Sequence, residues 1–594
     1  MKSHTYPTLL IRLFAISLLI AGHSIYAADK RPNIVFILID DLSHYGVSAY
    51  GAVELNSTQG FFDPVPVATP QIDRLAEEGV LAGNAFAYPI CEPTRVALMT
   101  GMNNHRNFVR AKALHESQIT FGDLFKKAGY TTGIAGKWKQ SRGTAKIPGE
   151  NYVDQFGWDE IHCFDLLYEG PRHIDPNFVI NGKIEWFNKD RNPATGRRYY
   201  GPDQVNRFAL NFIEEYKDKP FFLYYPMLLV HDEHTPTPDT EPQDLYDNFD
   251  VMTHTGISPD NQYGAFKGDD RRYFPDMMAY MDKMIGRVID KLDQLDLREN
   301  TLIIVMGDNG TKEAFSYTLA DGSEFVGGKG QCKVNGLQVP LILSYPGTID
   351  PGTQYNSLIN LTDLLPTICE AAKIPLPHKD DIDGVSFWPQ VTGVDTNAHR
   401  KHIYTWYNAN QPMSDQSKLL RYAQELDFKR YAPDANFPKG RFFDLRSDPF
   451  EQAGVNKVKF KWNNWHYSGL DIATLSAEQR AAYDRLGDVL EKNAYRPITD
   501  LKIKTASKQV KVQDSIQLQA VLMPNEATMR GLIWESSDPA IATIDKFGTV
   551  HAIKSGTVTI SLYSWDGTRP VATGKDADLQ RNGCSDKIEI TVYR

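Results

Sequence analysis

The sequence predicts an α/β fold around a mostly parallel sheet, followed by a small α+β subdomain and an all-β sandwich. Two observations support this prediction. Short apolar runs alternate with amphipathic stretches between residues 33 and 389. From Ile498 onward, β-rich segments recur with turns at about ten-residue spacing, as in β-sandwiches. The apolar runs are continuous rather than alternating, which is typical of strands covered on both faces.

The elements of the α/β part follow in order along the chain. Each predicted strand is an apolar run of a length usual for buried strands, and the stretches between the strands have the periodicity of amphipathic helices. The expected strands are 33–39, 131–135, 221–225, 301–306 and 339–344, and two of the expected helices are 71–78 and 117–128. After residue 400 the chain is mixed and aromatic, which suggests a small subdomain packed on the large one.

The composition is that of a globular protein. The 594 residues are 42% hydrophobic and 23% charged, with a formal net charge of −10. A net acidic chain argues against nucleic-acid binding, which requires a basic surface. The five cysteines are too few for a disulfide framework in a chain of this length.

The first 28 residues have the order of a secretory signal peptide. Lys2 and Arg12 precede the apolar stretch 13–22, and small residues follow up to Ala28. A membrane anchor is the alternative, but the apolar stretch is shorter than the ~20 residues that span a bilayer. We therefore expect an exported protein, periplasmic or secreted, with no stable membrane span. The predicted segments are the signal peptide 1–28, the α/β domain 29–399, the α+β subdomain 400–497 and the all-β domain 498–594.

The all-β tail resembles a known domain family. The segment Ile533–Ile544 contains the sequence Trp-Glu-Ser-Ser-Asp-Pro and is followed by Gly548–Ile553 and Gly556–Ile560. This pattern is similar to the bacterial Ig-like domain of group 2. The resemblance implies a spacer or adhesion module without chemistry of its own.

Polar side chains follow four of the predicted strands, at the edge where open α/β sheets bind ligands. They are Asp40 and Asp41 after the first strand, Lys137 and Lys139 after the second, His231 with His234 nearby after the third, and Asp308 with Asn309 after the fourth. A single polar residue at a strand end would indicate a turn. Four strands that end in this way favour a functional site.

Asp40, Asp41, Asp308 and Asn309 offer oxygen donors. Such hard ligands suit Ca²⁺ or Mg²⁺, whereas Zn²⁺ sites are richer in His and Cys. If the three carboxylates converge, a cation is needed to offset their repulsion. The alternative is that the aspartates only cap the segments that follow them.

A fifth segment places Cys91 at the start of a short helix, with Pro93 in the first turn and Gly101 closing the helix. The helix N-terminus favours an anion. Arg95 lies one turn on, on the same face, with a guanidinium suited to a tetrahedral oxyanion. The alternative is that Cys91 is a small buried apolar residue, as lone cysteines often are.

The string Cys91-x-Pro93-x-Arg95-x-x-x-Met99-Thr-Gly101 resembles the signature of the type I sulfatases. The resemblance extends over residues 31–455. It includes the Asp pair after the first strand, Gly136-Lys-Trp, Asp308-Asn-Gly, Gly328-Lys-Gly with Val339-Pro, and the segment from Asp444 to Glu451. It implies an alkaline-phosphatase-like sandwich and an enzyme that hydrolyses sulfate esters.

In that family a formylglycine-generating enzyme oxidises the cysteine at the Cys91 position to formylglycine (3-oxoalanine). One hydroxyl of the hydrated aldehyde attacks sulfur, and deprotonation of the other then expels sulfate. The resemblance implies that Asp40, Asp41, Asp308 and Asn309 hold one Ca²⁺ together with the modified Cys91.

The resemblance also assigns the cationic residues. Arg95, Lys137 and Lys329 would steady the nucleophile and the sulfate oxygens. His231 would lie near the leaving oxygen, as general acid or binding group. The spacing His-x-Pro fits His234, whereas the position at the strand end favours His231, which we choose.

One position departs from the family pattern. The family usually has Gly-Lys-Trp-His, and this chain has Lys139 in place of the histidine. Lysine has a reference pKa of ~10.4 and is a poor base unless that pKa is shifted. Lys139 would act either as a base or only as a sulfate-binding group.

Two other functions compete with sulfate-ester hydrolysis. A phosphatase or phosphodiesterase of the same superfamily would use Ser or Thr and two zinc ions, whereas this chain has Cys91 and Asn309 at the corresponding positions. A catalytically inactive glycan-binding relative would work through its Ig-like tail. Because export and the tail favour an extracellular polymer, we expect a sulfated polysaccharide or its oligosaccharides as substrate. The sequence does not distinguish the sugar, the sulfate position, or endo from exo action.

Overall fold

The computed structural model describes most of the chain. The described residues are 31–107, 114–140, 152–164, 171–187, 191–249, 270–376, 381–409, 417–461, 464–528, 531–565 and 584–594. The signal peptide expected at 1–28 lies outside them. None of the helices in these ranges has both the length and the apolar character needed to cross a membrane.

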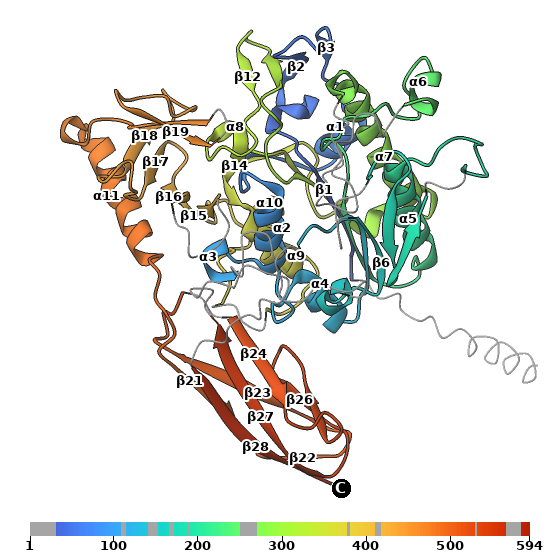
Figure 1. The fold of residues 1–594 in the computed structure, drawn as a ribbon, viewed down its shortest axis with the longest axis vertical. Coiled ribbons are helices and arrows are strands. Elements are labelled where there is room, and N and C mark those ends of the chain that lie inside the picture. The colour runs from blue at the N-terminus through green and yellow to red at the C-terminus, as the bar shows by residue number, and fades with distance from the viewer. Residues whose placement is uncertain are drawn as a thin grey trace, which may run out of the picture.

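A ten-stranded sheet forms the centre of the large domain (Figure 1). Its strand order is β14-β4-β13-β10-β1-β9-β5-β6-β7-β8. In chain order the strands are β1 Asn33–Ile39, β4 Val80–Phe86, β5 Thr131–Lys137, β6 Glu160–Phe164, β7 Asn177–Ile180, β8 Lys183–Trp186, β9 Phe221–Pro226, β10 Thr301–Gly307, β13 Leu341–Ser344 and β14 Thr353–Asn360.

The middle of this sheet is parallel, as the continuous apolar runs predicted. β1 pairs in parallel with β9 on one side and with β10 on the other. All seven residues of β1 are buried. Ile34, Phe36 and Leu38 enter one hydrophobic core, and the alternate residues of the strand enter a second core on the opposite face. Burial of both faces explains why the strand shows no polar alternation.

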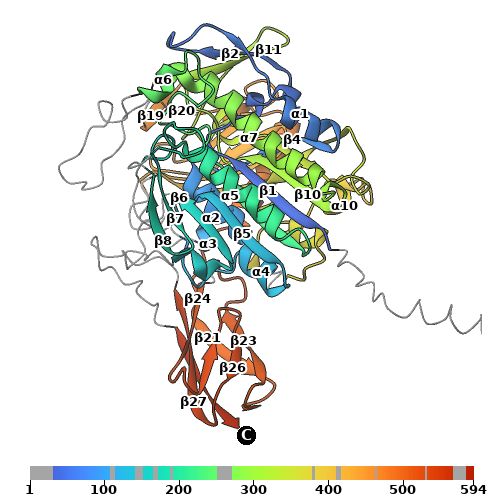
Figure 2. The same cartoon turned by 90° about the vertical axis from the view of Figure 1, so that its right-hand side faces the viewer.

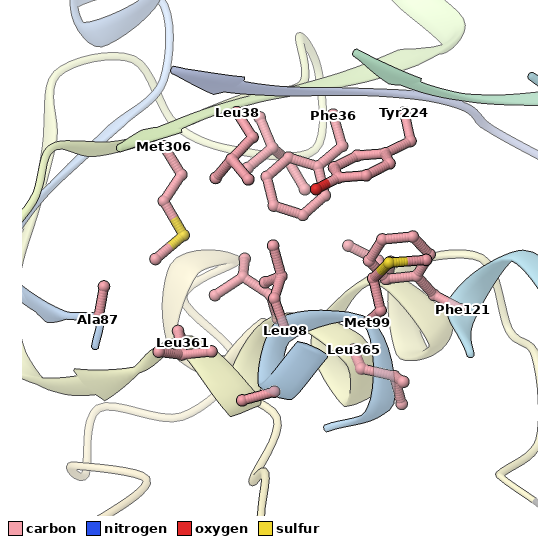
Figure 3. Close-up of a cluster of buried hydrophobic side chains, with 14 of the residues drawn as sticks. Phe36, Leu38, Ala87, Leu98, Met99, Phe121, Tyr224, Met306, Leu361 and Leu365 are labelled. Carbon is pink, nitrogen blue, oxygen red and sulfur yellow. The ribbon is translucent and has the colours of Figure 1, made fainter. Parts of the chain in front are cut away.

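Helices cover both faces of the sheet (Figure 2). Residues of α2, α4 and α9 belong to the core that contains Phe36, and residues of α1, α5 and α7 belong to the opposite core. Figure 3 shows Leu98 and Met99 of α2 facing Phe36, Leu38 and Met306 of the sheet. The helices are α1 Pro70–Glu77, α2 Cys91–Thr100, α3 Asn104–Asn107, α4 Phe121–Lys127, α5 Gly201–Glu215, α6 Asp244–Asp247, α7 Phe274–Gln294, α8 Val334–Leu337, α9 Leu364–Ala371, α10 Trp388–Val391 and α11 Ala477–Lys492.

The structure refines several predicted boundaries. The helix expected at 117–128 begins at Phe121, because Thr120 and Asp123 form a capping box at its start. The run 339–344 gives β13, which starts at Leu341 and pairs antiparallel with both of its neighbours. Parallel and antiparallel buried strands have the same apolar character, so the sequence did not reveal this reversal.

Smaller sheets complete the rest of the chain up to residue 497. One four-stranded sheet has the order β12-β11-β2-β3 and belongs to the large domain. A second, with the order β15-β16-β17-β18, forms the C-terminal subdomain together with the strand pair β19–β20 and helix α11. Their strands are β2 Ala52–Ser57, β3 Val65–Pro66, β11 Phe315–Leu319, β12 Glu324–Val326, β15 Ile403–Asn408, β16 Leu419–Gln424, β17 Phe428–Tyr431, β18 Arg441–Asp444, β19 Lys457–Lys461 and β20 Asn464–Tyr467.

The C-terminal part is a sandwich of two four-stranded sheets, as predicted. Unlike β1, its strands alternate between exposed and buried residues. The strands are β21 Asp500–Thr505, β22 Gln509–Lys511, β23 Ser515–Met523, β24 Gly531–Ser536, β25 Ala542–Ile544, β26 Thr549–Ala552, β27 Gly556–Trp565 and β28 Ser585–Tyr593.

This sandwich is docked on the large domain through the turn between β25 and β26. Lys546 in that turn donates to the carboxylate of Asp123 at 3.0 Å and to the carbonyl oxygens of Gln118 and Gln155 at 3.1 and 2.6 Å. The ammonium of Lys127 lies 3.8 Å from the ring centroid of Phe547. A cavity of about 460 Å³ lies beside this contact. The turn therefore attaches the tail to the N-terminal end of α4.

Candidate active site

The candidate site lies at the carboxyl ends of the central strands. The register of β1 and β10 pairs Ile39 with Gly307, so Asp40 and Asp308 leave the sheet side by side. Asp41 has a left-handed backbone with φ of 63°. In that conformation its backbone N–H donates to Oδ1 of Asp308 at 3.0 Å. Parallel pairing thus joins residues that are more than 260 positions apart in the chain.

The carboxylates converge tightly. One oxygen each from Asp40, Asp41 and Asp308 lies within 4.8 Å of the other two, and all three side chains are buried. Among the described residues, Oδ1 of Asp40 and Oδ1 of Asn309 are buried and have no hydrogen-bond donor. Buried acceptors without donors are costly. This set of oxygen atoms therefore fits a hard cation.

Three cationic side chains surround the carboxylates. Lys137 donates to Oδ2 of Asp40 at 2.5 Å, and Arg95 donates through Nε and Nη2 to Oδ2 of Asp308 at 3.1 and 2.8 Å. Lys329 donates to Oδ2 of Asp41. Each aspartate therefore has its own cationic partner, which offsets part of the cost of burying the charge.

The pKa values of the aspartates differ because their surroundings differ. Burial alone would raise the pKa of Asp40, but the attraction of Lys137 and the other cations holds it well below its usual range. Burial and the charge of Asp40 raise the pKa of Asp308 to about 7, against the opposing effect of Arg95 and Lys137. One carboxyl of the cluster thus resists ionisation, as expected when like charges share a site.

Cys91 faces this cluster from the first turn of α2. Its Sγ, an oxygen of Asp40 and a ring nitrogen of His231 lie within 4.8 Å of one another. Lys137 approaches the sulfur at 3.5 Å. Burial and the charge of Glu92 raise the pKa of the thiol to about 12, although Lys137 opposes the shift. As an unmodified thiol, Cys91 is therefore protonated at neutral pH.

Comparisons with known proteins identify the large domain. The profile of the sulfatase family matches residues 32–374, more than half of the chain. The chain belongs to the sulfatase family. It is a sulfuric ester hydrolase, as its motifs predicted. The C-terminal profile of N-sulphoglucosamine sulphohydrolase matches residues 332–462 of this sulfatase, and the bacterial Ig-like domain of group 2 matches residues 497–573.

Curated relatives of the sulfatase match over most of their length. An N-acetylgalactosamine-6-O-sulfatase of Bacteroides thetaiotaomicron is 25% identical over 501 residues, covering 72% of this chain and 90% of the relative. An ulvan-active sulfatase of Formosa agariphila is 25% identical, covering 71% and 76%.

Solved structures share the fold of the sulfatase. Ps i-CgsB in complex with a neocarrahexaose is 21% identical, with a TM-score of 0.55 and coverage of 78% of this chain and 92% of that one. BT4656, solved in complex with its substrate D-glucosamine-2-N,6-O-disulfate, is also 21% identical, with a TM-score of 0.55 and coverage of 78% of this chain and 97% of that one. At these identities the likeness shows the fold.

The two histidines after β9 occupy different environments in the sulfatase. Nε2 of His231 lies 3.8 Å from Oδ2 of Asp41, at the carboxylate cluster. Burial, with Lys137 and Lys329, lowers the pKa of His231 to about 4 against the opposing effect of Asp232. His234 instead packs edge-on against the rings of Phe274 and Phe315, each at a centroid distance of 5.3 Å. His231 therefore lies with the other predicted site residues, and His234 lies in the core beneath them.

Lys139 lies at the edge of the cluster. Its backbone is left-handed, with φ of 51°, and its Nζ is 4.0 Å from Oε1 of Glu92. Its role as base or sulfate ligand stays a prediction.

Sequence reasoning missed two buried residues of the site. Glu92 lies next to Cys91, with its carboxylate 3.5 Å from the sulfur. Arg172 places Nη1 3.0 Å from Nδ1 of His231. Glu92 could have been found as the charged residue inside the Cys-x-Pro-x-Arg string. Arg172 follows no apolar run and belongs to no motif, so the sequence offered no signal for it.

Proposed function

We propose that this sulfatase is an exported enzyme that hydrolyses sulfate esters of carbohydrates with a formylglycine at position 91 and one bound Ca²⁺. Asp40, Asp41, Asp308 and Asn309 would hold the ion together with the modified Cys91. The substrate would be a sulfated polysaccharide or its oligosaccharides. Maturation would require a formylglycine-generating enzyme.

The observation that carries this proposal is the buried group of oxygen atoms that faces Cys91. Three buried carboxylates offer oxygen atoms that lie within 4.8 Å of one another. Two acceptor oxygens, on Asp40 and Asn309, have no donor in the described part of the chain. The atoms available to bind a metal ion in this group are all oxygens, which supports Ca²⁺ over Zn²⁺. When bound, the ion would supply positive charge that activates the nucleophile and binds a sulfate oxygen.

The surroundings of Cys91 disfavour an unmodified thiol as the nucleophile, which is consistent with a formylglycine at this position. The thiolate is the nucleophilic form of cysteine, and burial with Glu92 nearby makes that form scarce at neutral pH. The hydrated aldehyde would supply a hydroxyl nucleophile at the same place. The start of α2 would also favour the negative charge that develops there.

The cationic side chains have positions suited to binding sulfate. Lys137 reaches both Asp40 and the sulfur of Cys91, so its ammonium can hold the nucleophile in place. Arg95 fixes the carboxylate of Asp308 and keeps it oriented toward the cluster. Lys329, through Asp41, lies at the partly exposed side of the cluster, where it can contact the oxygens of an entering sulfate.

His231 would act on the leaving group. Its lowered pKa makes the ring neutral at neutral pH. The ring would therefore donate a hydrogen bond to the ester oxygen through a neutral N–H, or it would become protonated when the substrate binds and then act as the general acid. Lys139 lies further out, beside Glu92, and would bind sulfate or serve as base.

The proposed substrate class follows from the relatives. The names of the matched proteins include N-acetylgalactosamine-6-O-sulfatase, N-acetylglucosamine-6-O-sulfatase and ulvan-active sulfatase, all of which specify sulfated sugars. The predicted signal peptide and the Ig-like tail favour an extracellular polymer over a small aryl ester.

Two measurements test the proposal. Mass spectrometry of the peptide that contains residue 91 should show conversion of the thiol to the aldehyde in protein made with a formylglycine-generating enzyme. The same protein should release sulfate from at least one member of a panel of sulfated glycans. Cys91→Ala should reduce sulfate release by at least about 10³-fold, because it removes the nucleophile.

A matched control separates chemistry from loss of a thiol. Cys584 lies in the Ig-like domain, where its Sγ contacts the carbonyl oxygen of Ile498 at 3.5 Å. Cys584→Ala should retain full sulfate release. An active preparation that keeps an ordinary thiol at position 91 would overturn the formylglycine proposal.

A further inference from the structure

The strand pair β19–β20 of the C-terminal subdomain carries two lysines and two aromatic residues on one face. Lys457 pairs with Tyr467, and Lys459 pairs with Trp465. Directly paired residues of antiparallel strands point to the same side. Both lysines are exposed, Trp465 is 40% exposed and Tyr467 is half-buried. We call these four residues the lysine–aromatic face.

The positive charge of this face is not neutralised locally. The ammonium of Lys457 lies 5.1 Å from the ring centroid of Trp465 and 5.8 Å from that of Tyr467. Among the described residues, Lys457 and Lys459 form no ion pair with a carboxylate. Exposed cations without a local carboxylate partner are available to bind a negatively charged ligand.

Further cations lie behind the same strands. His466 points inward from β20, and its pKa is lowered to about 2 by burial and by the nearby charges of Arg441, Lys333, Lys429 and Lys418. Arg441 is buried, and within the described chain its Nε and Nη2 atoms have no hydrogen-bond partner. Within the described part of the chain, Lys429 is the one of these cations with a carboxylate partner at hydrogen-bond distance, Glu451. Cationic side chains therefore lie on both sides of the strand pair.

A short loop connects this region to the active site. Lys329 contacts Asp41 in the carboxylate cluster, and the next residue, Gly330, donates to the carbonyl oxygen of Pro89, two positions before Cys91. Lys333 then places its ammonium 5.5 Å from the ring centroid of Tyr467. Four residues span at most about 14 Å. The lysine–aromatic face therefore begins one loop away from the site of sulfate hydrolysis.

We propose that the lysine–aromatic face is a distal subsite for a sulfated glycan chain that extends out of the active site. The exposed ring of Trp465 would pack on the apolar face of a sugar, and Lys457 and Lys459 would bind sulfate groups other than the one being hydrolysed. This inference rests on the proposed function and adds to it a preference for chains over single sugars. A track made of cations and flat rings is the arrangement that other flexible polyanions also use.

Binding can be tested without turnover. The Cys91→Ala protein is run in native gels that contain chondroitin sulfate, carrageenan or chemically desulfated chondroitin, and the dissociation constant is taken from the retardation. For each sulfated glycan that retards the Cys91→Ala protein, the further changes Lys457→Glu and Lys459→Glu should weaken binding about ten-fold, because two attractive charges become repulsive. Trp465→Ala should weaken it about five-fold.

A control variant on the Ig-like domain tests for non-specific charge effects. Lys511 and Tyr593 are exposed and paired on neighbouring strands, so they provide a similar lysine–aromatic pair far from this loop. Lys511→Glu with Tyr593→Ala should leave the retardation unchanged. Equal retardation of all variants, or equally strong retardation by desulfated chondroitin, would overturn the subsite.

A kinetic readout links the subsite to catalysis. With Cys91 intact and matured, the ratio of kcat/KM for a sulfated oligosaccharide to kcat/KM for the corresponding monosaccharide sulfate should fall about ten-fold in the Lys457→Glu, Lys459→Glu variant. An unchanged ratio would contradict the proposal. Failure of the proposed function would appear differently, because the wild-type enzyme would then release no sulfate from either substrate.

Discussion

Charged side chains are buried at the active-site end of the central sheet and exposed to solvent in the Ig-like domain. At the end of β1 and β10, aspartates, an arginine and a lysine are buried together, and each has a side-chain exposure of 3% or less. In the Ig-like domain, Lys587 and Glu589 of β28 point outward, in alternation with the inner residues Ile588, Ile590 and Val592. Among its described residues, no charged side chain is buried.

The burial of charge distinguishes the catalytic domain from the Ig-like domain. Moving charged groups out of water costs several kcal/mol per group unless partners compensate. A domain that needs only to remain folded avoids this cost by alternation, as the Ig-like strands do. The sulfatase domain accepts it at one edge, where the charges can act on a charged substrate. Buried charge of this density is therefore informative about function, whereas exposed charge is not.

The largest expected effect comes from breaking a buried pair. Arg95→Ala should lower the free energy of unfolding by about 3–5 kcal/mol, because Asp308 and Asp40 lose their shared cation in a buried site. The matched change in the Ig-like domain is Lys502→Ala, which removes an exposed pair with Asp500 and should cost less than about 1 kcal/mol. Urea unfolding measures both. Equal losses would mean that burial does not distinguish the two regions.

Removal of the proposed Ca²⁺ should have the next largest effect. Dialysis against a calcium chelator should destabilise the carboxylate cluster, and Ca²⁺ at one hundred times its dissociation constant should restore about 2.7 kcal/mol. Hydrogen exchange should locate the change at the ends of β1 and β10, with β21–β28 unaffected. A chelated protein with unchanged exchange at Asp40 and Asp308 would argue against an ion at this site.

The smallest effect concerns the contact between the two regions. Lys546→Ala removes the partner of a buried carboxylate on α4 and should cost about 1–2 kcal/mol. Hydrogen exchange should increase at the start of α4, while hydrolysis of a small sulfate ester stays the same. Lys554→Ala, an exposed residue of the same domain, is the control and should change neither quantity.

Much of the fold was predictable from single segments. The run 33–39 predicted β1 to the residue, because burial on both faces leaves a continuous apolar signal. β4 was missed, since Gly83 and Asn84 interrupt its apolar run. β14 was missed because its first half alternates between exposed and partly exposed residues. Of these three strands, the sequence revealed the one whose apolar run is uninterrupted and missed the two broken by polar or glycine residues.

The candidate site was predictable to a similar extent. Asp40, Asp41, Asp308 and Asn309 follow strands, and parallel pairing brings such residues together. The position of Arg172 beside His231, by contrast, depends on packing between segments that share no pattern. The pairing of Lys546 with Asp123 joins two domains across 423 positions and could not be read from either segment.

The central position of β1 has a consequence for biosynthesis. The strand β1, which Asp40 directly follows, is made near the beginning of the chain, yet its neighbours β9 and β10 begin 188 and 268 residues later. At ribosomal rates of 5–20 residues per second, roughly 15 to 50 seconds separate its synthesis from that of its second neighbour. Until β9 is made, this seven-residue apolar segment has no partner strand. We expect the nascent chain to depend on chaperones that keep it unfolded until β9 and β10 can pair with β1.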